Sequence, residues 1–186
     1  EYRAYNIKDI INDLRKENRF GFEEMTYLLL FGELPTANEL QEFQNLLASR
    51  RTLPEFFVRE TILTNPSSDV MNSMSRCILA LASYDEKVSD ISIENVLEQS
   101  LGLIADFPLL AIYSYQSYVH YFKKESLYIH YPDPKMTTAE NILRMLRPDC
   151  HYTEVEAKVL DIALILHMEH GGGCLLYTSP SPRDRT

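Results

Sequence analysis

The chain has 186 residues, of which 45% are hydrophobic, and a formal net charge of −9 with a pI near 5. This is enough apolar material for one globular domain or a large part of one. The acidic balance argues against nucleic acid or an anionic membrane surface as partner, because both attract clustered Lys and Arg. No apolar run approaches the roughly 20 residues of a membrane span, and the N-terminus lacks a signal pattern. We therefore expect a soluble, cytoplasmic protein.

Helical periodicity runs through the whole chain. Apolar residues recur every three or four positions over residues 6–18, and a more apolar helix is predicted over residues 22–31. Gly32 and Pro35 end that second helix, because glycine suits a left-handed cap and proline cannot continue the hydrogen-bond ladder. Further helix starts are predicted at residues that cap or open a helix: Thr36 with Glu39, Pro54, Ser67 or Ser68, Ser92, Thr137 or Thr138, and Thr153 with Glu156.

The pattern predicts about eight helices and no strand of useful length. Pro108 interrupts the long apolar helix that follows Ser92, so we expect a kink near Asp106 and Phe107. Residues 123–134 are polar and contain prolines, as a surface connection does. The fold class predicted is all-α, without a detectable internal repeat.

The last predicted helix, residues 155–166, is apolar on almost every side and runs into His167, His170 and the glycines 171–173. The two histidines stand three residues apart, roughly one helical turn, so their imidazoles project from neighbouring positions on one face. For His170 a binding role is favoured, because the adjacent glycines expose backbone and permit close approach of a ligand. For His167 a binding role and a structural role, with ring nitrogens bonded to backbone, are equally compatible with the pattern.

Two other interpretations of this corner fit poorly. A zincin site needs histidines four apart with a glutamate directly after the first, and the one candidate third ligand is Cys174. A phosphate-binding loop needs Lys and Ser or Thr after its glycines and a helix that starts there, whereas the helix here ends. We therefore expect no metal and no bound phosphate.

The two ends of the chain look unlike natural termini. Glu1 lies directly in patterned sequence without an initiating methionine, so we expect an upstream segment to be missing. Residues 174–186 have neither helical nor strand period and resemble the translation of a sequencing adapter. We interpret them as a non-native tail, with a natural flexible tail as the alternative.

Several segments resemble the citrate synthase family. The stretch that carries His167 and His170 is similar to the family's H-x-D/E-H-x-G-G segment. Three further segments match in order and spacing: residues 2–9 (Y-R-G-Y-x-I-x-D in the family), 27–36 (a helix ending in G-x-L-P-T) and 103–108 (L-I-A-x-x-P). The resemblance covers almost all of residues 1–173, which identifies this region as a partial large helical domain of the citrate synthase fold.

This resemblance implies an acyltransferase that joins oxaloacetate to the acetyl group of acetyl-CoA and releases citrate and CoA, the entry step of the tricarboxylic acid cycle. It implies that His170 binds oxaloacetate, with His167 as a weaker candidate, and that no metal or prosthetic group takes part. The family's catalytic aspartate and second catalytic histidine would lie after residue 173. The resemblance therefore places no catalytic residue within this chain and implies that the chain alone is inactive, while the full-length protein would be a homodimer.

Three departures from the family pattern leave the acyl donor open. Ala4 replaces a glycine, Met71-Asn72-Ser73-Met74 replaces a common H-P-M, and Cys174 replaces an asparagine. Propionyl-CoA, as in 2-methylcitrate synthases, is the alternative to acetyl-CoA. A non-catalytic helical interaction domain remains as a different class of function.

Overall fold

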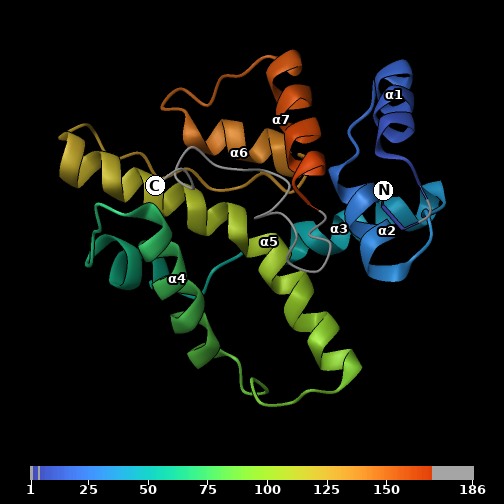
Figure 1. Cartoon of the computed structure of the whole chain (residues 1–186). Helices are drawn as coiled ribbons and strands as arrows, with labels where there is room; N and C mark the ends of the chain where they lie inside the picture. The colour runs from blue at the N-terminus through green and yellow to red at the C-terminus, as the bar shows by residue number, and fades with distance from the viewer. Residues whose placement is uncertain (1, 4, 169–186) are drawn as a thin grey trace, which may run out of the picture. The chain divides into compact units, whose positions relative to one another are not determined.

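A computed structural model describes residues 2, 3 and 5–168, which fold into two compact units (Figure 1). Of the described residues, those up to residue 40 and those from 154 to 168 form the first unit, and residues 41–153 form the second. Within the described residues there is no strand, apart from an isolated bridge between Tyr2 and Tyr5. The predicted all-α class is confirmed.

The first unit contains α1 (Ile7–Glu17), α2 (Phe22–Phe31) and α7 (Glu154–Leu166). The Asn6 side chain accepts a hydrogen bond from the Lys8 N–H and so caps the start of α1. Gly32, in the left-handed conformation at φ 89°, ends α2 as predicted and donates its N–H to the Leu28 carbonyl. α2 and α7 contact each other.

The core of this unit joins the two ends of the chain. Its buried members are Tyr2, Leu14, Met25, Leu28 and Ile165, and Leu28 and Ile165 are 0% exposed. Complete burial of one such aliphatic side chain stabilises the fold by about 2 kcal/mol. The N-terminal segment and α7 therefore stabilise each other although they are far apart in sequence.

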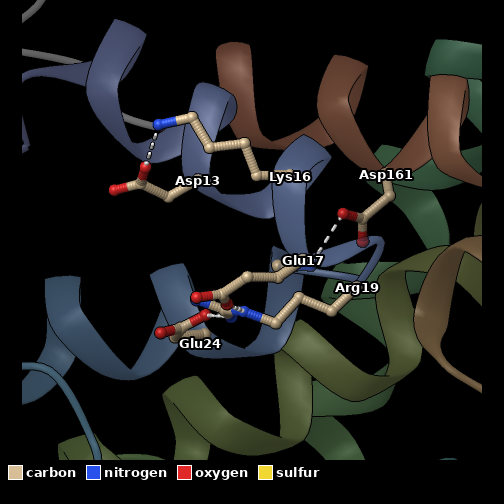
Figure 2. A network of polar contacts seen from close by, with 7 residues as sticks. Asp13, Lys16, Glu17, Arg19, Glu24 and Asp161 are labelled. Atoms are coloured by element: carbon tan, nitrogen blue, oxygen red, sulfur yellow. Dashed lines mark hydrogen bonds and ion pairs between the residues drawn. The ribbon is translucent and has the colours of Figure 1, made fainter.

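A buried carboxylate caps α2 from outside. Gly21 is the N-cap residue and has no side chain to accept a hydrogen bond from the first turn. Asp161 of α7, labelled in Figure 2 and 1% exposed, does so instead. Its Oδ2 accepts from the Gly21 N–H at 2.8 Å and its Oδ1 from the Phe22 N–H at 3.1 Å. The positive end of the α2 dipole also favours this charge.

The second unit is built around the long helix α5 (Ile93–Tyr118). α5 contacts α4 (Val70–Leu81) and α6 (Thr138–Leu146) and the π-helical turn η1 (Val58–Leu63). α3 (Ala37–Arg50) begins in the first unit and continues into the second. Two short turns follow α4 and α5: the 3-10 turn η2 (Ala82–Tyr84) and the π-helical turn η3 (Val119–Lys123).

The predicted kink in α5 is present. The helix continues through Pro108, and Figure 1 shows it changing direction in its middle part. Proline has no N–H for the carbonyl four residues back and its ring crowds that carbonyl, which bends a helix without ending it when tertiary packing supports both halves.

One helical stretch, Ile93–Lys123, has the length and apolar composition of a membrane-spanning helix, contrary to the expectation from sequence. A core helix of a globular protein meets the same criterion. α5 buries Leu101, Ala105, Leu109, Leu110 and Ile112, and 33% of the most apolar window of this stretch is buried.

The local predictions hold at some helix starts and not at others. Thr137 and Glu140 form a capping box at α6, Thr36 and Glu39 exchange hydrogen bonds before α3, and Ser92 caps α5. Two predictions were wrong in detail. The residue that caps α4 is Asp69, not Ser67 or Ser68, because the Asp69 carboxylate accepts hydrogen bonds from the Met71 and Asn72 N–H groups. Pro54 does not open an α-helix; it precedes a turn that leads to η1.

Replacing Asp161 with Asn should destabilise the first unit. An amide cannot accept two backbone hydrogen bonds through both of its terminal atoms, and one buried N–H would lose its acceptor. We expect a loss of about 2 kcal/mol in the free energy of unfolding, measured by urea denaturation. Asp13→Asn is the matched control, because the exposed Asp13–Lys16 ion pair contributes about 0.5 kcal/mol or less. Equal effects of the two substitutions would contradict the cap.

Replacing Gly21 with Ala should also destabilise the chain. A Cβ there would lie 2.3 Å from Leu14 Cδ1 and 3.2 Å from Ile165 Cδ1, so buried side chains would have to move at a cost of about 1–3 kcal/mol. Gly102→Ala in α5 is the control: its Cβ would meet no atom within 4 Å, and alanine should stabilise the helix by roughly 0.5–1 kcal/mol. Thermal unfolding of both variants tests this, and a neutral Gly21→Ala would show that Leu14 is free to rearrange.

Candidate functional site

The C-terminal end of α7 leads into the predicted site. α7 ends at Leu166, and the backbone then tightens: the His167 N–H donates to the Leu164 carbonyl at 3.2 Å and the Met168 N–H to the Ile165 carbonyl at 3.3 Å. Such bonds to the third preceding residue form a 3-10 turn, the usual end of an α-helix. His170, the predicted oxaloacetate ligand, lies outside the described residues, as does the predicted tail 174–186.

His167 is exposed on this last turn, and its ring has a backbone partner. Nδ1 lies 2.8 Å from the Ala163 carbonyl oxygen. A carbonyl oxygen only accepts, so Nδ1 carries the hydrogen and Nε2 is the nitrogen that remains to contact a ligand. The structural role that the sequence left open for His167 thus has an observed contact, and its role in binding stays a prediction.

Two contacts hold the end of α7 in place. The Tyr2 hydroxyl donates to the Ile165 carbonyl, one of the last four helical carbonyls, which commonly lack a partner within the helix. Ile165 itself is fully buried, and Met168 packs against the same cluster. Together with Asp161 one turn earlier, these contacts hold α7, the helix that ends directly before His167.

Sequence reasoning missed both anchors, although one left a signal. Asp161 is the one charged residue in the apolar run from Val159 to Leu166, and a lone charge there indicates a buried partner. Tyr2 was noted only as part of a family segment. Its contact spans 163 sequence positions, which no local pattern reveals.

The cations near α7 are paired within the first unit. Arg19 lies between Glu17 and Glu24 and donates to both carboxylates (Figure 2). Burial lowers the pKa of Arg19, but the hydrogen bonds that it donates to these carboxylates, together with their charge, outweigh burial, and the net pKa is raised. Lys158 donates to Glu154 and to Asn18. A dicarboxylate would therefore find neither cation unpaired here.

The same cations border a cavity of about 490 Å³ between α1 and α7. Its apolar wall includes Ile11, Leu14 and Ile162. Arg19 and Lys158 in its lining are paired with carboxylates, whereas Arg15, which also lines it, forms no ion pair within the described residues.

No metal centre is found in the described part of the chain, where no three His, Cys, Asp or Glu side chains cluster as ligands. The described cysteines, Cys77 and Cys150, are free thiols. Burial raises the pKa of the Cys77 thiol, which keeps it protonated and unreactive.

Comparison with known proteins extends over nearly the whole chain. The family model for the citrate synthase C-terminal domain matches residues 1–174. The chain is 32% identical to the citrate synthase of Haloferax volcanii, covering 91% of this chain and 42% of that protein. It is 25% identical to 2-methylcitrate synthase 2 of Corynebacterium glutamicum, covering 96% of this chain and 44% of that protein.

Solved structures agree with the sequence comparison. The crystal structure of citrate synthase from Pyrobaculum aerophilum superimposes with a TM-score of 0.74 at 25% identity, covering 91% of this chain and 41% of that one. The chain thus spans about two fifths of the length of the relatives that it matches. The family match, the all-α fold and the helix that leads into the His-Gly segment agree, and the chain belongs to the citrate synthase family.

Proposed function

We propose that this chain is part of an acyltransferase that condenses oxaloacetate with the acetyl group of acetyl-CoA to give citrate and CoA. The observation that carries the proposal is the citrate synthase family match over residues 1–174, which includes the segment of His167 and His170. The reaction needs no metal or prosthetic group, since acetyl-CoA serves as a co-substrate. Residues 1–173 are then part of the large helical domain, and residues 174–186 are a non-native tail.

His170 would position oxaloacetate. An imidazole N–H that donates to the substrate's keto or carboxylate oxygen orients the dicarboxylate and withdraws charge from the carbon to be attacked. The anchoring of α7 by Asp161 and Tyr2 supports this role, since a positioning group must itself be held in place.

The acyl donor has one alternative. The match to a 2-methylcitrate synthase, at lower identity than the match to the Haloferax citrate synthase, keeps propionyl-CoA as a second candidate. The two donors differ by one methylene, which a pocket distinguishes by only about 1–3 kcal/mol.

We further propose that the full-length protein is a cytoplasmic homodimer. Support comes from α4, where Met71 and Leu79 lie on one face of the helix and are 69% and 74% exposed. Large exposed apolar side chains at helical spacing are typical of a surface that another chain covers. A chain without its downstream part would retain this surface and could act only as a helical interaction domain.

His170→Ala in the full-length protein should lower kcat/KM for oxaloacetate about 100-fold, because one preorganised donor to the reacting group is lost. His167→Ala is the matched control. Its exposed ring already donates to Ala163, so we expect a change of threefold or less. Steady-state kinetics with oxaloacetate as the varied substrate measures both. A larger effect at His167 than at His170 would reverse the assignment.

The 186-residue chain alone should release no thiol from acetyl-CoA in the presence of oxaloacetate, because the catalytic aspartate and histidine that the family uses are proposed to lie outside it. A colorimetric thiol assay compares the chain with a buffer blank. Release above the blank that depends on oxaloacetate would show that residues 1–173 contain a complete active site.

A further inference from the structure

The cavity of about 490 Å³ between α1 and α7 has no part in the proposed reaction. Both helices line it with residues spaced three or four positions apart, so each presents one face to it. These residues are Ile11, Leu14, Arg15 and Asn18 of α1 and Val155, Lys158, Val159 and Ile162 of α7, and Arg19 and Asp161 complete the lining. A volume of this size is typical of a small-molecule site.

The apolar part of this lining is open to solvent. Val155 and Val159, one helical turn apart on α7, are 71% and 63% exposed. Ile11 and Ile162 are half-buried, and Leu14 is buried. Covering exposed apolar side chains with an apolar group is favourable, because it removes their surface from water. The cavity therefore suits the apolar body of a ligand.

Arg15 adds a free cation to the same lining. Its side chain is exposed and forms no hydrogen bond and no ion pair within the described residues. Arg19 and Lys158, the other cations of the lining, each donate to carboxylates of the chain. A guanidinium group presents its N–H donors in one plane, and a pair of them matches the two oxygens of a carboxylate. Arg15 can therefore bind an anion without breaking a contact within the chain.

The acid in the lining is not available to a ligand. Asp161 is 1% exposed, and its two oxygens already accept from the Gly21 and Phe22 N–H groups. A cationic ligand would thus find no accessible carboxylate among the described lining residues, whereas an anionic ligand finds Arg15. One free cation matches one negative charge on the ligand. Charge complementarity therefore favours a monoanion.

We propose that this cavity binds a small monocarboxylate with an apolar body. Its carboxylate accepts hydrogen bonds from the Arg15 guanidinium, and its apolar part packs against Val159 and Ile162. A dicarboxylate fits less well, because Arg19 and Lys158 are already paired and the second carboxylate would lie against apolar side chains. This inference is independent of the proposed condensation reaction.

Isothermal titration calorimetry on the 186-residue chain at neutral pH tests the proposal with two probes of similar size, 4-phenylbutanoate and 4-phenylbutan-1-ol. The carboxylate should bind about tenfold more tightly than the alcohol, since it alone forms charge-assisted hydrogen bonds. Arg15→Gln should remove this advantage and leave alcohol binding unchanged. Val159→Ser, at an exposed position, should weaken both probes equally, by about threefold, because apolar contact area is lost.

Lys16→Gln is the matched control for a general effect of positive charge. Lys16 follows Arg15 on α1 but does not line the cavity, and it pairs with the exposed Asp13 (Figure 2). This substitution should change carboxylate affinity by about twofold or less, because exposed charges at a distance are screened by salt. Glutarate, a dicarboxylate without an apolar body, should bind about tenfold more weakly than 4-phenylbutanoate.

Four results would each overturn the proposal: absence of binding, equal binding of carboxylate and alcohol, an undiminished carboxylate advantage in Arg15→Gln, or equal effects of Arg15→Gln and Lys16→Gln. Far-UV circular dichroism establishes that each variant folds. Arg15→Lys is the second variant at this position. It keeps the charge but loses the planar pair of donors, so it should retain a carboxylate advantage of about threefold.

Discussion

Among the buried carboxylates of the first unit, Asp161 is the one that joins α7 to the start of α2. Taking an ionised Asp161 out of water costs several kcal/mol unless charge and hydrogen bonds compensate it. The start of α2 supplies both, through the Gly21 and Phe22 N–H groups and the positive end of the helix dipole. α7, which leads to the histidines, is thereby tied to α2. The Tyr2 hydroxyl adds a second tie at Ile165.

The helices could be predicted because their caps are formed by neighbouring residues. Contacts between residues far apart in the sequence could not be predicted. Gly32, Ser92 and the Thr137–Glu140 box act through neighbours within four residues, so their sequence patterns were sufficient. The α4 cap was wrong because Asp69 competes with two nearby serines for the same N–H groups, and its carboxylate is the stronger acceptor. For the site, the sequence pattern predicted the apolar helix that precedes His167. It could not predict Asp161 or Tyr2 as anchors, since their partners lie 139 or more positions away.

The two units bury acidic groups in different surroundings. Asp161 has two backbone donors and acts as a structural cap. Asp106 of α5 has a buried Oδ1 without a hydrogen-bond partner within the described residues, and burial raises its pKa to about 7. Both acids stand in apolar helical sequence, and the structure around them separates the two cases.

Amide hydrogen exchange at Gly21 and Phe22 tests the central claim most directly. First-turn amides of a helix usually exchange fast, because they lack acceptors within the helix. If the Gly21 and Phe22 N–H groups are hydrogen-bonded to the Asp161 carboxylate, they should exchange as slowly as the Leu28 amide in the interior of α2. Exchange of that amide requires cooperative opening of the unit. Exchange of these two amides at the rate of an exposed loop would contradict the account.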